Sequence, residues 1–594
     1  MGRGTFGRLR DVWRAQLTRR SRWLWFPKLA LLTVFVVATN DFLGRRSLPG
    51  YALFAFAWLL SIASMLHVAV FGGRVARIAW TTAIVTSTFV ATTFQSILQA
   101  PLTFADQNML LKNVAFAGMV LEFYRPFLMG PTLLGLVGIA AINVPPYAGR
   151  ADEPPTAGAR LGALGLRLSP VVLTIIVLYC KHGDGTNGFA VQHRTLAFLA
   201  VEGVERLREG PPPARREVTM PHSGARPLKN IVVVMDESIR GDLLDINAEG
   251  GAPTGLKGRQ DAINFGVMSS IANCSHETNM AFRYGIGRRD YLRQLASNPS
   301  MWSYAKRAGY DTFYFDGQRT GGELQNGMDP RERSEIDHFV QLPADVRAQD
   351  RDWKIAAAIR GALGPGAGSK PIFAYVNKAG AHFPYEGKYP PERAWFTPVL
   401  AHEYFGNEAD PRHALKSFTE SQDATDRQTH ERFKNSWMNA AGWNASRFFE
   451  VLLDGLDLSE TVILYMADHG QDLHQDGRPG YATHCTSGDA HPDEGRVPLV
   501  ILTTHPETAS RLSAAAGRNF GRVSQFSVFP SMLRWMGYSP DAIAAEPGFD
   551  PPIEAPPVAD NQQFLSTFFV QLGAKPQWVA CPSPVTDARR SSND

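Results

Sequence analysis

Polar segments with carboxylates and histidines follow three apolar runs of strand length. One run ends in Asp236-Glu237-Ser238, a second leads into the stretch from Asn377 to His382, and a third ends in Asp468-His469-Gly470. Because ligands of open α/β sheets bind beyond the carboxyl ends of the strands, we expect the three segments to meet at one edge. Carboxylate oxygens and imidazole nitrogens are both zinc ligands. A single Asp-His pair after a strand is more often a turn or a cap, so the predicted metal site depends on Glu237 occupying the same strand-end position.

A fourth segment, Ala272-Asn273-Cys274-Ser275-His276-Glu277-Thr278-Asn279, offers a nucleophile. It is a loop of small residues with hydroxyls and a thiol, and it follows the first strand and helix of the predicted sheet domain. A metal ion lowers the pKa of a bound hydroxyl and orients its attack. The same residues also fit a helix N-terminus with Ser275 as its cap and Thr278 in its first turn. The two interpretations are compatible, since a helix N-terminus favours a bound phosphate.

The elements that must position these segments alternate between strand-like and helix-like stretches from Asn230 onward. The candidate strands are Ile231–Met235, Thr312–Phe315, Ile372–Val376, Val462–Met466 and Val497–Leu502. The candidate helices between them include Met301–Ala308, Trp353–Leu363 and Phe433–Leu453. Continuous β-branched runs, without alternation, are typical of strands buried on both faces of a parallel sheet. The sequence therefore predicts an α/β domain with a mostly parallel sheet and right-handed crossovers.

The first third of the chain is more apolar and is predicted to span a membrane. Arginines dominate the N-terminal arm, and long apolar segments follow them in place of the short apolar region and cleavage site of a signal peptide. Five stretches approach the roughly 20 helical residues that cross a bilayer core. They are Trp23–Leu43, Tyr51–Phe71, Ile78–Leu98, Phe127–Val144 and Ala163–Cys180. A further apolar stretch, Asn108–Tyr124, carries Lys112 and Glu122, and we expect an interfacial or partly buried helix there.

Basic loop residues predict the orientation of these five spans. The N-terminal arm, the loop with Arg74 and Arg77 and the loop with Arg150 would be cytoplasmic, and the opposing pair Arg45-Arg46 is outnumbered. An odd number of spans places everything after Lys181 outside the cytoplasm. An even number would leave that part inside the cytoplasm.

Composition limits the remaining classes of protein. The 594 residues include 60 Lys and Arg against 56 Asp and Glu, a formal net charge of +4 that gives no support for a nucleic-acid binder. The 44% of hydrophobic residues excludes a disordered chain. Four cysteines are too few for a disulfide scaffold or a cysteine-rich zinc module. One bridge can form among Cys274, Cys485 and Cys581, and the sequence does not name its partners.

The composition shifts divide the chain into four parts. Residues 1–181 are predicted to form the multi-span membrane domain, and residues 182–229 a linker with a surface helix at Arg194–Leu207. Residues 230–545 would form the catalytic α/β domain. Residues 546–594, rich in proline and polar side chains, are expected to be an irregular C-terminal extension.

The motifs and the layout together resemble the alkaline phosphatase superfamily. Asp236-Glu237-Ser238-x-Arg240, the Cys274-Ser275 loop, the His382 segment and Asp468-His469-Gly470 look like the motifs of membrane phosphoethanolamine and phosphoglycerol transferases. Within that superfamily, the sequence more specifically resembles the lipid A phosphoethanolamine transferases. It covers the layout of nearly the whole chain but close motif identity at only four short segments. It implies a bundle of about five transmembrane helices followed by a sulfatase-like α/β sandwich domain.

A sulfatase proper is not expected from the same segments. That group carries a Cys/Ser-x-Pro-x-Arg signature, and the segment that begins at Cys274 has neither Pro nor Arg at those places.

Carried over residue by residue, the resemblance implies a ligand set for Zn²⁺. Glu237, Asp468 and His469 would bind the metal, with the nucleophile as the fourth ligand. The nucleophile maps best onto Ser275, although the family commonly has Thr at that place, and Thr278 is the alternative. One zinc site is implied, and a second metal is left open.

The resemblance also implies residues that contact the substrate. His382 would hold the donor phosphate, and His484 matches a second histidine on the substrate side. Arg240 and His491 are further candidates for substrate binding, His491 without a clear counterpart in the family. His474 is a weaker candidate still.

The implied activity is a two-step transfer of phosphoethanolamine. A phospholipid such as phosphatidylethanolamine would be the donor, and lipid A or a glycan of the cell envelope would accept the group from a covalent Ser or Thr intermediate. The implied protein is an inner-membrane monomer with its catalytic domain in the periplasm and no nucleic-acid partner. A phosphoglycerol transferase, a membrane phosphodiesterase or phosphatase, and a catalytically dead binding or sensor protein are the alternatives. The sequence does not identify the donor head group or the acceptor, and it does not distinguish transfer from hydrolysis.

Overall fold

The chain forms two compact units in a computed structural model. One contains Met1–Pro211 and Val570–Lys575, and the other contains Pro212–Phe569 and Pro576–Asp594. The structure describes residues 19–37, 48–98, 101–112, 125–145, 156–208, 214–224, 227–364, 370–385, 387–400, 427–475, 483–486, 490–557, 561–567, 572 and 577–582. The first unit is helical, and the second is built around a seven-stranded sheet.

The first unit has a helix at each of the five predicted spans. These helices are α2 (Arg19–Val37), α3 (Leu48–Phe71), α4 (Arg74–Leu98), α7 (Met129–Asn143) and α8 (Ala157–Cys180). Within the described residues, α3, α4 and α8 are long and apolar enough to cross a membrane. The apolar parts of α2 and α7 are shorter, Trp25–Val36 and Met129–Asn143. The predicted membrane bundle of about five helices is therefore present, with three helices that meet the length and composition of a full span.

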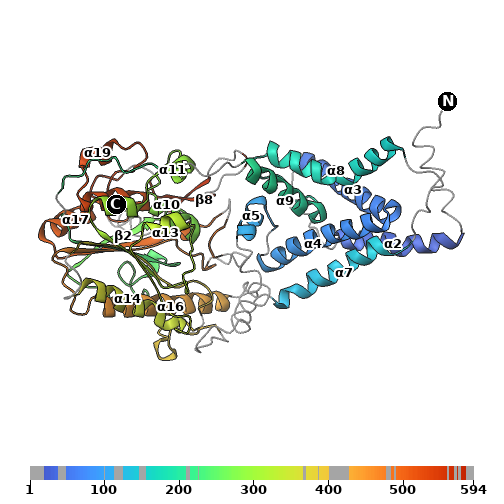
Figure 1. Cartoon of the computed structure of the whole chain (residues 1–594). Coiled ribbons are helices and arrows are strands. Elements are labelled where there is room, and N and C mark those ends of the chain that lie inside the picture. The colour runs from blue at the N-terminus through green and yellow to red at the C-terminus, as the bar shows by residue number, and fades with distance from the viewer. Residues whose placement is uncertain are drawn as a thin grey trace. The chain divides into compact units, whose positions relative to one another are not determined.

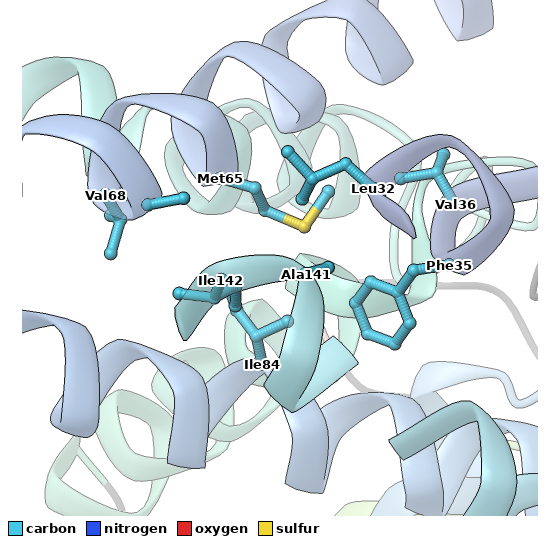
Figure 2. Close-up of a cluster of buried hydrophobic side chains, with 9 residues drawn as sticks. Leu32, Phe35, Val36, Met65, Val68, Ile84, Ala141 and Ile142 are labelled. Carbon is cyan, nitrogen blue, oxygen red and sulfur yellow. The ribbon is translucent and has the colours of Figure 1, made fainter. Parts of the chain in front are cut away.

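The core of this bundle is a cluster of apolar side chains from α2, α3, α4 and α7. Figure 2 shows Leu32 and Phe35 of α2, Met65 of α3, and Ile84 of α4 in this cluster, together with Ile142 of α7. All five are at most 2% exposed. Close side-chain contact between the helices stabilises such a bundle, because surrounding lipid tails are as apolar as these residues.

The stretch predicted as a surface helix in the linker belongs to the first unit. It forms α9 (Val191–Arg208), which packs against α4 and α8. Phe198 and Val201 are buried, and Ser87 of α4 donates a hydrogen bond of 2.6 Å to the carbonyl of Val191. The surface expectation is thus wrong for one face of the helix. The predicted interfacial helix at Asn108–Tyr124 begins within α5 (Phe104–Lys112), and its remainder lies outside the described residues.

The seven-stranded sheet of the second unit contains all five predicted strands and two that the sequence analysis missed. The strands are β1 (Asn230–Asp236), β2 (Ala262–Ser269), β3 (Asp311–Asp316), β4 (His338–Gln341), β5 (Ile372–Asn377), β6 (Thr461–Ala467) and β7 (Arg496–Leu502). Their order in the sheet is β2-β7-β6-β1-β5-β3-β4. The five strands from β6 to β4 run parallel, and β7 is antiparallel to both of its neighbours. The prediction of a mostly parallel α/β sheet is confirmed.

Helices cover both faces of this sheet. They are α10 (Ser275–Arg283), α11 (Tyr291–Ser297), α12 (Met301–Arg307), α13 (Pro330–Ser334), α14 (Arg351–Leu363), α16 (Arg427–Leu452), α17 (Pro506–Asn519), α18 (Val528–Met536) and α19 (Pro540–Ala545). The strand register places Tyr375 and Tyr465 on opposite faces. Tyr375 contacts Phe282 of α10 and Trp302 of α12, whereas Tyr465 contacts Phe449 of α16. Figure 1 shows α14 beside α16, on the face of the sheet to which Tyr465 points.

The missed strand β2 explains how the nucleophile segment reaches the site. Because β2 is antiparallel to β7, and β7 is antiparallel to β6, the carboxyl ends of β2 and β6 lie at the same edge. The chain leaves β2 at Ser269 and enters α10 at Ser275. The segment therefore arrives at the edge where β1 and β6 also end.

The C-terminal part is more ordered than the expected irregular extension. Its described residues form an antiparallel pair, β8 (Gln563–Thr567) and β9 (Gln577–Ala580). Leu565 of β8 donates to the carbonyl of Ile271 at 2.9 Å, and its own carbonyl accepts from Asn273 at 3.3 Å. This pair thus supports the loop that precedes α10.

Candidate active site

Three of the predicted metal ligands meet at the carboxyl edge of the sheet. Glu237 directly follows β1, and Asp468 and His469 directly follow β6. Because β1 and β6 are adjacent and parallel, with Asp236 paired to Ala467, the two segments leave the sheet side by side. One ligand atom from each of the three residues lies within 4.8 Å of the others, and all three side chains are buried. The strand-end rule applied to the sequence therefore brought together the correct neighbours.

Ser275 completes this cluster. Its Oγ lies 3.1 Å from Glu237 Oε1 and 3.1 Å from His469 Nε2. His469 Nε2 lies 3.5 Å from Glu237 Oε1 and 3.8 Å from Asp468 Oδ1. A tetrahedral zinc ion with ligands at about 2.0–2.2 Å separates its ligand atoms by roughly 3.3–3.6 Å. The four side chains thus have the chemistry and the mutual spacing of a tetrahedral zinc site.

Backbone geometry holds the two strand ends together. Ser238 is in the left-handed region, with φ of 61°, which is unfavourable for a residue with a side chain. In this conformation its N–H donates to Asp468 Oδ1 at 3.0 Å and its hydroxyl donates to Glu237 Oε1 at 2.8 Å. The N–H of His469 also donates to Asp468 Oδ1, at 2.8 Å. These bonds fix both carboxylates relative to the sheet.

The loop after β5 approaches the site through a glycine. Gly380 has φ of 48°, and a Cβ at this position would lie 2.4 Å from the carbonyl oxygen of Glu237. Only glycine allows this approach, which brings the His382 segment beside β1. Asp352 of α14 holds the same loop by accepting from the N–H groups of Ala379 at 2.7 Å and Gly380 at 3.0 Å.

Gln318 is a site residue that the sequence analysis missed. It follows β3, and its Nε2 donates to Glu237 Oε2 at 3.0 Å and to the carbonyl of Lys378 at 2.7 Å. The strand-end rule, applied to the predicted strand Thr312–Phe315, would have found it. Gln318 restrains the second oxygen of Glu237, and both oxygens of this carboxylate lie within 3.2 Å of Ser275 Oγ.

Burial and mutual charge perturb the ionisation of the cluster. Burial raises the pKa of Asp468 to about 8, and the nearby Glu237 carboxylate adds to this rise. Burial alone would lower the pKa of His469, but Asp468 and Glu237 raise it to about 9. Burial would likewise raise the pKa of Glu237, yet its hydrogen bond with His469 and the surrounding histidines hold it well below its usual value. A buried pair of carboxylates of this kind needs a proton or a cation beside it.

His382 and His484 both lie beside this cluster. The His484 ring stacks on His469 with centroids 4.3 Å apart, and the His382 ring meets His484 edge-on at 5.4 Å. His382 is exposed, and its Nδ1 lies 2.5 Å from the carbonyl of Phe383. Nδ1 of His484 lies 3.0 Å from Thr483 Oγ1. The structure thus groups the two predicted substrate-side histidines with His469, the predicted metal ligand.

A disulfide joins the two loops that carry Ser275 and His484. Cys274 and Cys485 are bonded, with Cα atoms 4.6 Å apart and a separation of 211 positions in sequence. The N–H of Cys485 also donates to the carbonyl of Asn273 at 2.8 Å. The bridge that the sequence left unassigned therefore lies at the site, and Cys581 is a free, buried thiol.

The two candidate nucleophiles have different surroundings. Thr278 is fully buried, and its hydroxyl donates to the carbonyl of Ala272 at 3.0 Å and accepts from the N–H of the same residue at 3.1 Å. Ser275 is half-buried and faces Glu237 and His469. The expectation that Ser275 caps the helix is wrong, because Cys274 occupies the N-cap position and Ser275 is the first helical residue.

The remaining candidates for substrate binding interact with other side chains and backbone groups of the protein. Arg240 is 3% exposed, and its guanidinium donates to Asp242 and pairs with Asp493 at 2.6 Å. Nδ1 of His491 accepts from the N–H of Asp493 at 3.3 Å and caps a short 3-10 helix. His474 is 8% exposed, with Nδ1 3.9 Å from Asp472. The described contacts place Arg240 and His491 in a buried ionic network around Asp493.

The fold and the strand-end cluster define a member of the alkaline phosphatase superfamily. The family model described as Sulfatase matches residues 229–538, so the chain belongs to this family. The resemblance noted from the sequence is thereby confirmed. None of the curated proteins matches the chain.

Solved structures show the same architecture at low sequence identity. The integral membrane lipooligosaccharide phosphoethanolamine transferase A from Neisseria meningitidis is 14% identical, with a TM-score of 0.59. The similarity covers 89% of this chain and 98% of that one. The periplasmic domain of EptC from Escherichia coli, in a complex with Zn, is 14% identical with a TM-score of 0.45, over 62% of this chain and 97% of that one. The first comparison extends the shared fold over most of the chain.

Proposed function

We propose that this chain transfers phosphoethanolamine from a phospholipid to an acceptor of the cell envelope, with Ser275 as the nucleophile. The observation that carries the proposal is the position of Ser275 Oγ, 3.1 Å from both Glu237 Oε1 and His469 Nε2. The family and the fold shared with a lipooligosaccharide phosphoethanolamine transferase support the same reaction class.

Glu237, Asp468, His469 and Ser275 would hold one Zn²⁺ in this proposal. Their oxygen and nitrogen donors suit zinc. Ser275, Glu237 and His469 lie 3.1–3.5 Å from one another, and His469 lies 3.8 Å from Asp468, which suits a tetrahedral site. Zinc, when bound, would supply Lewis acidity that favours the alkoxide form of a serine. Ser238 and Gln318 keep both carboxylates oriented toward this position.

In the first step, Ser275 Oγ gives its proton to solvent and attacks the phosphorus of phosphatidylethanolamine. The bond between phosphorus and the diacylglycerol oxygen breaks, and that oxygen takes up a proton as diacylglycerol leaves. His382 and His484 face the same side of the cluster and would bind the phosphate and donate this proton. Since Ser275 is the first residue of α10, the N-terminus of this helix favours the negative charge of the phosphate.

In the second step, a hydroxyl or phosphate oxygen of the acceptor attacks the phosphorus of the Ser275 adduct. The bond between phosphorus and Ser275 Oγ breaks, and the proton lost by an acceptor hydroxyl returns to the serine. Attack by water in place of the acceptor would make the protein a hydrolase.

The location of the reaction follows from its substrates. Both the donor lipid and an envelope acceptor are found at a membrane surface, and three described helices are able to span a membrane. We place the chain in the inner membrane with its catalytic domain in the periplasm. The Cys274–Cys485 disulfide supports this side, because disulfides persist in oxidising compartments and are rare in the cytosol.

Mass spectrometry of the full chain in detergent tests the proposal. After incubation with phosphatidylethanolamine, we expect a phosphoethanolamine adduct on the peptide that contains Ser275. Ser275→Ala should abolish it, whereas Ser275→Thr, the residue common in the family, should retain it. An adduct that persists in Ser275→Ala would contradict the assignment, and a phosphoglycerol adduct formed only from phosphatidylglycerol would change the donor. Release of free phosphoethanolamine from the wild type without an acceptor would identify a hydrolase.

A further inference from the structure

Away from the proposed metal site, a cavity lined by tryptophans lies beside the loop that carries His382. It has a volume of about 350 Å³, and Trp353, Trp395 and Trp443 form part of its wall. This volume is within the range of small-molecule sites, roughly 300–1,000 Å³. Trp353 belongs to α14, Trp443 to α16, and Trp395 to the segment that follows β5. Three elements distant in sequence thus present aromatic side chains to one space.

The indole N–H groups of two of these rings are used within the protein. Trp443 Nε1 donates to the carbonyl of Gln349 at 2.8 Å, and Trp353 Nε1 donates to Asp350 Oδ1 at 3.1 Å. Trp395 is 41% exposed, and its ring lies against Gly442, where a Cβ would be 3.0 Å from the ring. The rings are therefore held in place while part of each remains open to a ligand.

The charges in the wall are balanced. Arg347 pairs with Asp350 at 2.6 Å, and Arg447 pairs with Glu450 at 2.8 Å. Arg393 lies over the rings of Trp395 and Trp443, within 6 Å of both centroids, and Glu392 lines the same wall. Three basic and three acidic side chains leave no excess charge, so the cavity does not select a polyanion.

One buried acceptor in the wall has no partner among the described residues. The Oε1 atom of Gln349 makes no hydrogen bond there, although the residue is only 7% exposed. Buried acceptors are normally hydrogen-bonded, because leaving one unsatisfied is unfavourable, so a group that donates a hydrogen bond is expected beside it. Gln349 lines the cavity, so rotation of its amide would let an O–H group of a ligand there provide that bond.

We propose that this cavity binds a sugar ring of a neutral glycan. The C–H face of a sugar ring packs on an indole ring, and its hydroxyls bond to amide, carboxylate and guanidinium groups, which are the groups in this wall. The inference goes beyond the proposed transfer reaction and does not depend on it. If the transfer takes place, the bound glycan is its acceptor.

The cavity is connected to the site through neighbouring residues. Asp352, adjacent to Trp353, holds the N–H groups of Ala379 and Gly380. Asn444, adjacent to Trp443, donates to the carbonyl of Gly380 at 3.3 Å. The elements that form the cavity therefore also fix the loop that leads to His382, which places the bound glycan on the edge of the sheet where Ser275 lies.

Binding of defined oligosaccharides to the full chain tests the proposal. The Ser275→Ala variant, in a detergent without a sugar head group, removes turnover from the measurement and separates this test from the transfer reaction. We expect calorimetry and ligand-observed NMR to detect binding of at least one of maltotetraose, cellotetraose and chitotetraose. Trp395→Ala should weaken that binding about tenfold, and Gln349→Leu should weaken it several-fold.

Trp395→Phe is the matched control, since it keeps an aromatic face at the same exposed position and should retain most of the affinity. Unchanged far-ultraviolet circular dichroism would show that each variant is folded. The proposal is wrong if none of the three oligosaccharides binds, or if binding is the same in Trp395→Ala and the wild-type cavity. It is also wrong if only a bisphosphorylated disaccharide binds, because the cavity would then recognise an anion.

Discussion

Hydrogen-bond partners, more than residue type, separate the two hydroxyls of the α10 N-terminus. Thr278 bonds to both the N–H and the carbonyl of Ala272, so its oxygen is committed to the backbone. Ser275 has only side-chain partners, and these are the ligand atoms of Glu237 and His469. The Thr278 hydroxyl therefore stabilises the loop, and the Ser275 hydroxyl is positioned to act as a nucleophile.

This difference predicts the effect of Thr278→Val. The substitution keeps the shape of the side chain but leaves the buried N–H of Ala272 without its hydroxyl partner, which should cost about 1–3 kcal/mol of unfolding free energy. The carbonyl of Ala272 keeps the hydrogen bond that the Ser270 hydroxyl donates at 2.7 Å. Thermal unfolding of the purified chain would show this as a lower Tm. The Ser275 adduct should still form below that temperature. An unchanged Tm together with complete loss of the adduct would instead make Thr278 the nucleophile.

The sequence is informative about a residue when its role follows from its position on a strand. Glu237, Asp468 and His469 could be predicted because each directly follows a recognisable apolar run. Arg240 also follows such a run, yet its partner Asp493 is distant in sequence and precedes β7. The residues around Arg240 do not indicate that Asp493 forms an ion pair with its guanidinium. The role of Arg240 in an ionic network could therefore not be predicted.

At the scale of elements, the sequence located five strands of a mostly parallel sheet but neither the antiparallel direction of β7 nor the irregular strand β2. Continuous apolar runs identified β1, β3, β5, β6 and β7. The missed strand β2 is interrupted by a bulge between Asn264 and Val267, where Gly266 has φ of 80°. A glycine and a register shift remove the regular pattern on which strand prediction depends. The residues of β7 do not by themselves indicate that this strand is antiparallel, because its direction is defined only by its pairing with β6.

The Cys274–Cys485 disulfide connects two such elements, and its removal should slow the chemistry. We expect Cys274→Ser/Cys485→Ser to lower unfolding free energy by about 2–5 kcal/mol. Because the bridge ties the start of α10 to the His484 loop, the rate of adduct formation should fall at temperatures where the variant is folded. Single-turnover mass spectrometry with saturating phosphatidylethanolamine measures this rate separately from donor binding.

Cys180→Ser is the control for this pair, since Cys180 is a free, exposed cysteine in the other unit. It should leave both Tm and the adduct rate unchanged. A double variant with wild-type adduct rate would show that the hydrogen bond from Cys485 N–H to the Asn273 carbonyl suffices to position the loops.

At the scale of the whole molecule, all proposed metal ligands belong to one of the two units. Glu237, Ser275, Asp468 and His469 lie in the sheet unit, and the apolar helices lie in the other. A ligand that binds the folded state stabilises it by about 2.7 kcal/mol when present at 100 times its Kd. Removal of the metal should therefore loosen the sheet unit and leave the helical unit unaffected.

Hydrogen exchange with mass spectrometry measures the two units separately in the full chain. We expect about one zinc ion per chain as purified, and after chelation faster exchange in peptides of β1, β6 and α10 but not of α3, α4 or α8. Asp468→Asn is the matched control: the isosteric amide weakens the site, so this variant should contain less zinc and respond little to the chelator. Equal changes in both units, or full loss of zinc without any change in β1 and β6, would place the metal elsewhere. Either result would remove the basis for activating Ser275, because its hydroxyl would then face the Glu237 carboxylate and the His469 imidazole without a metal.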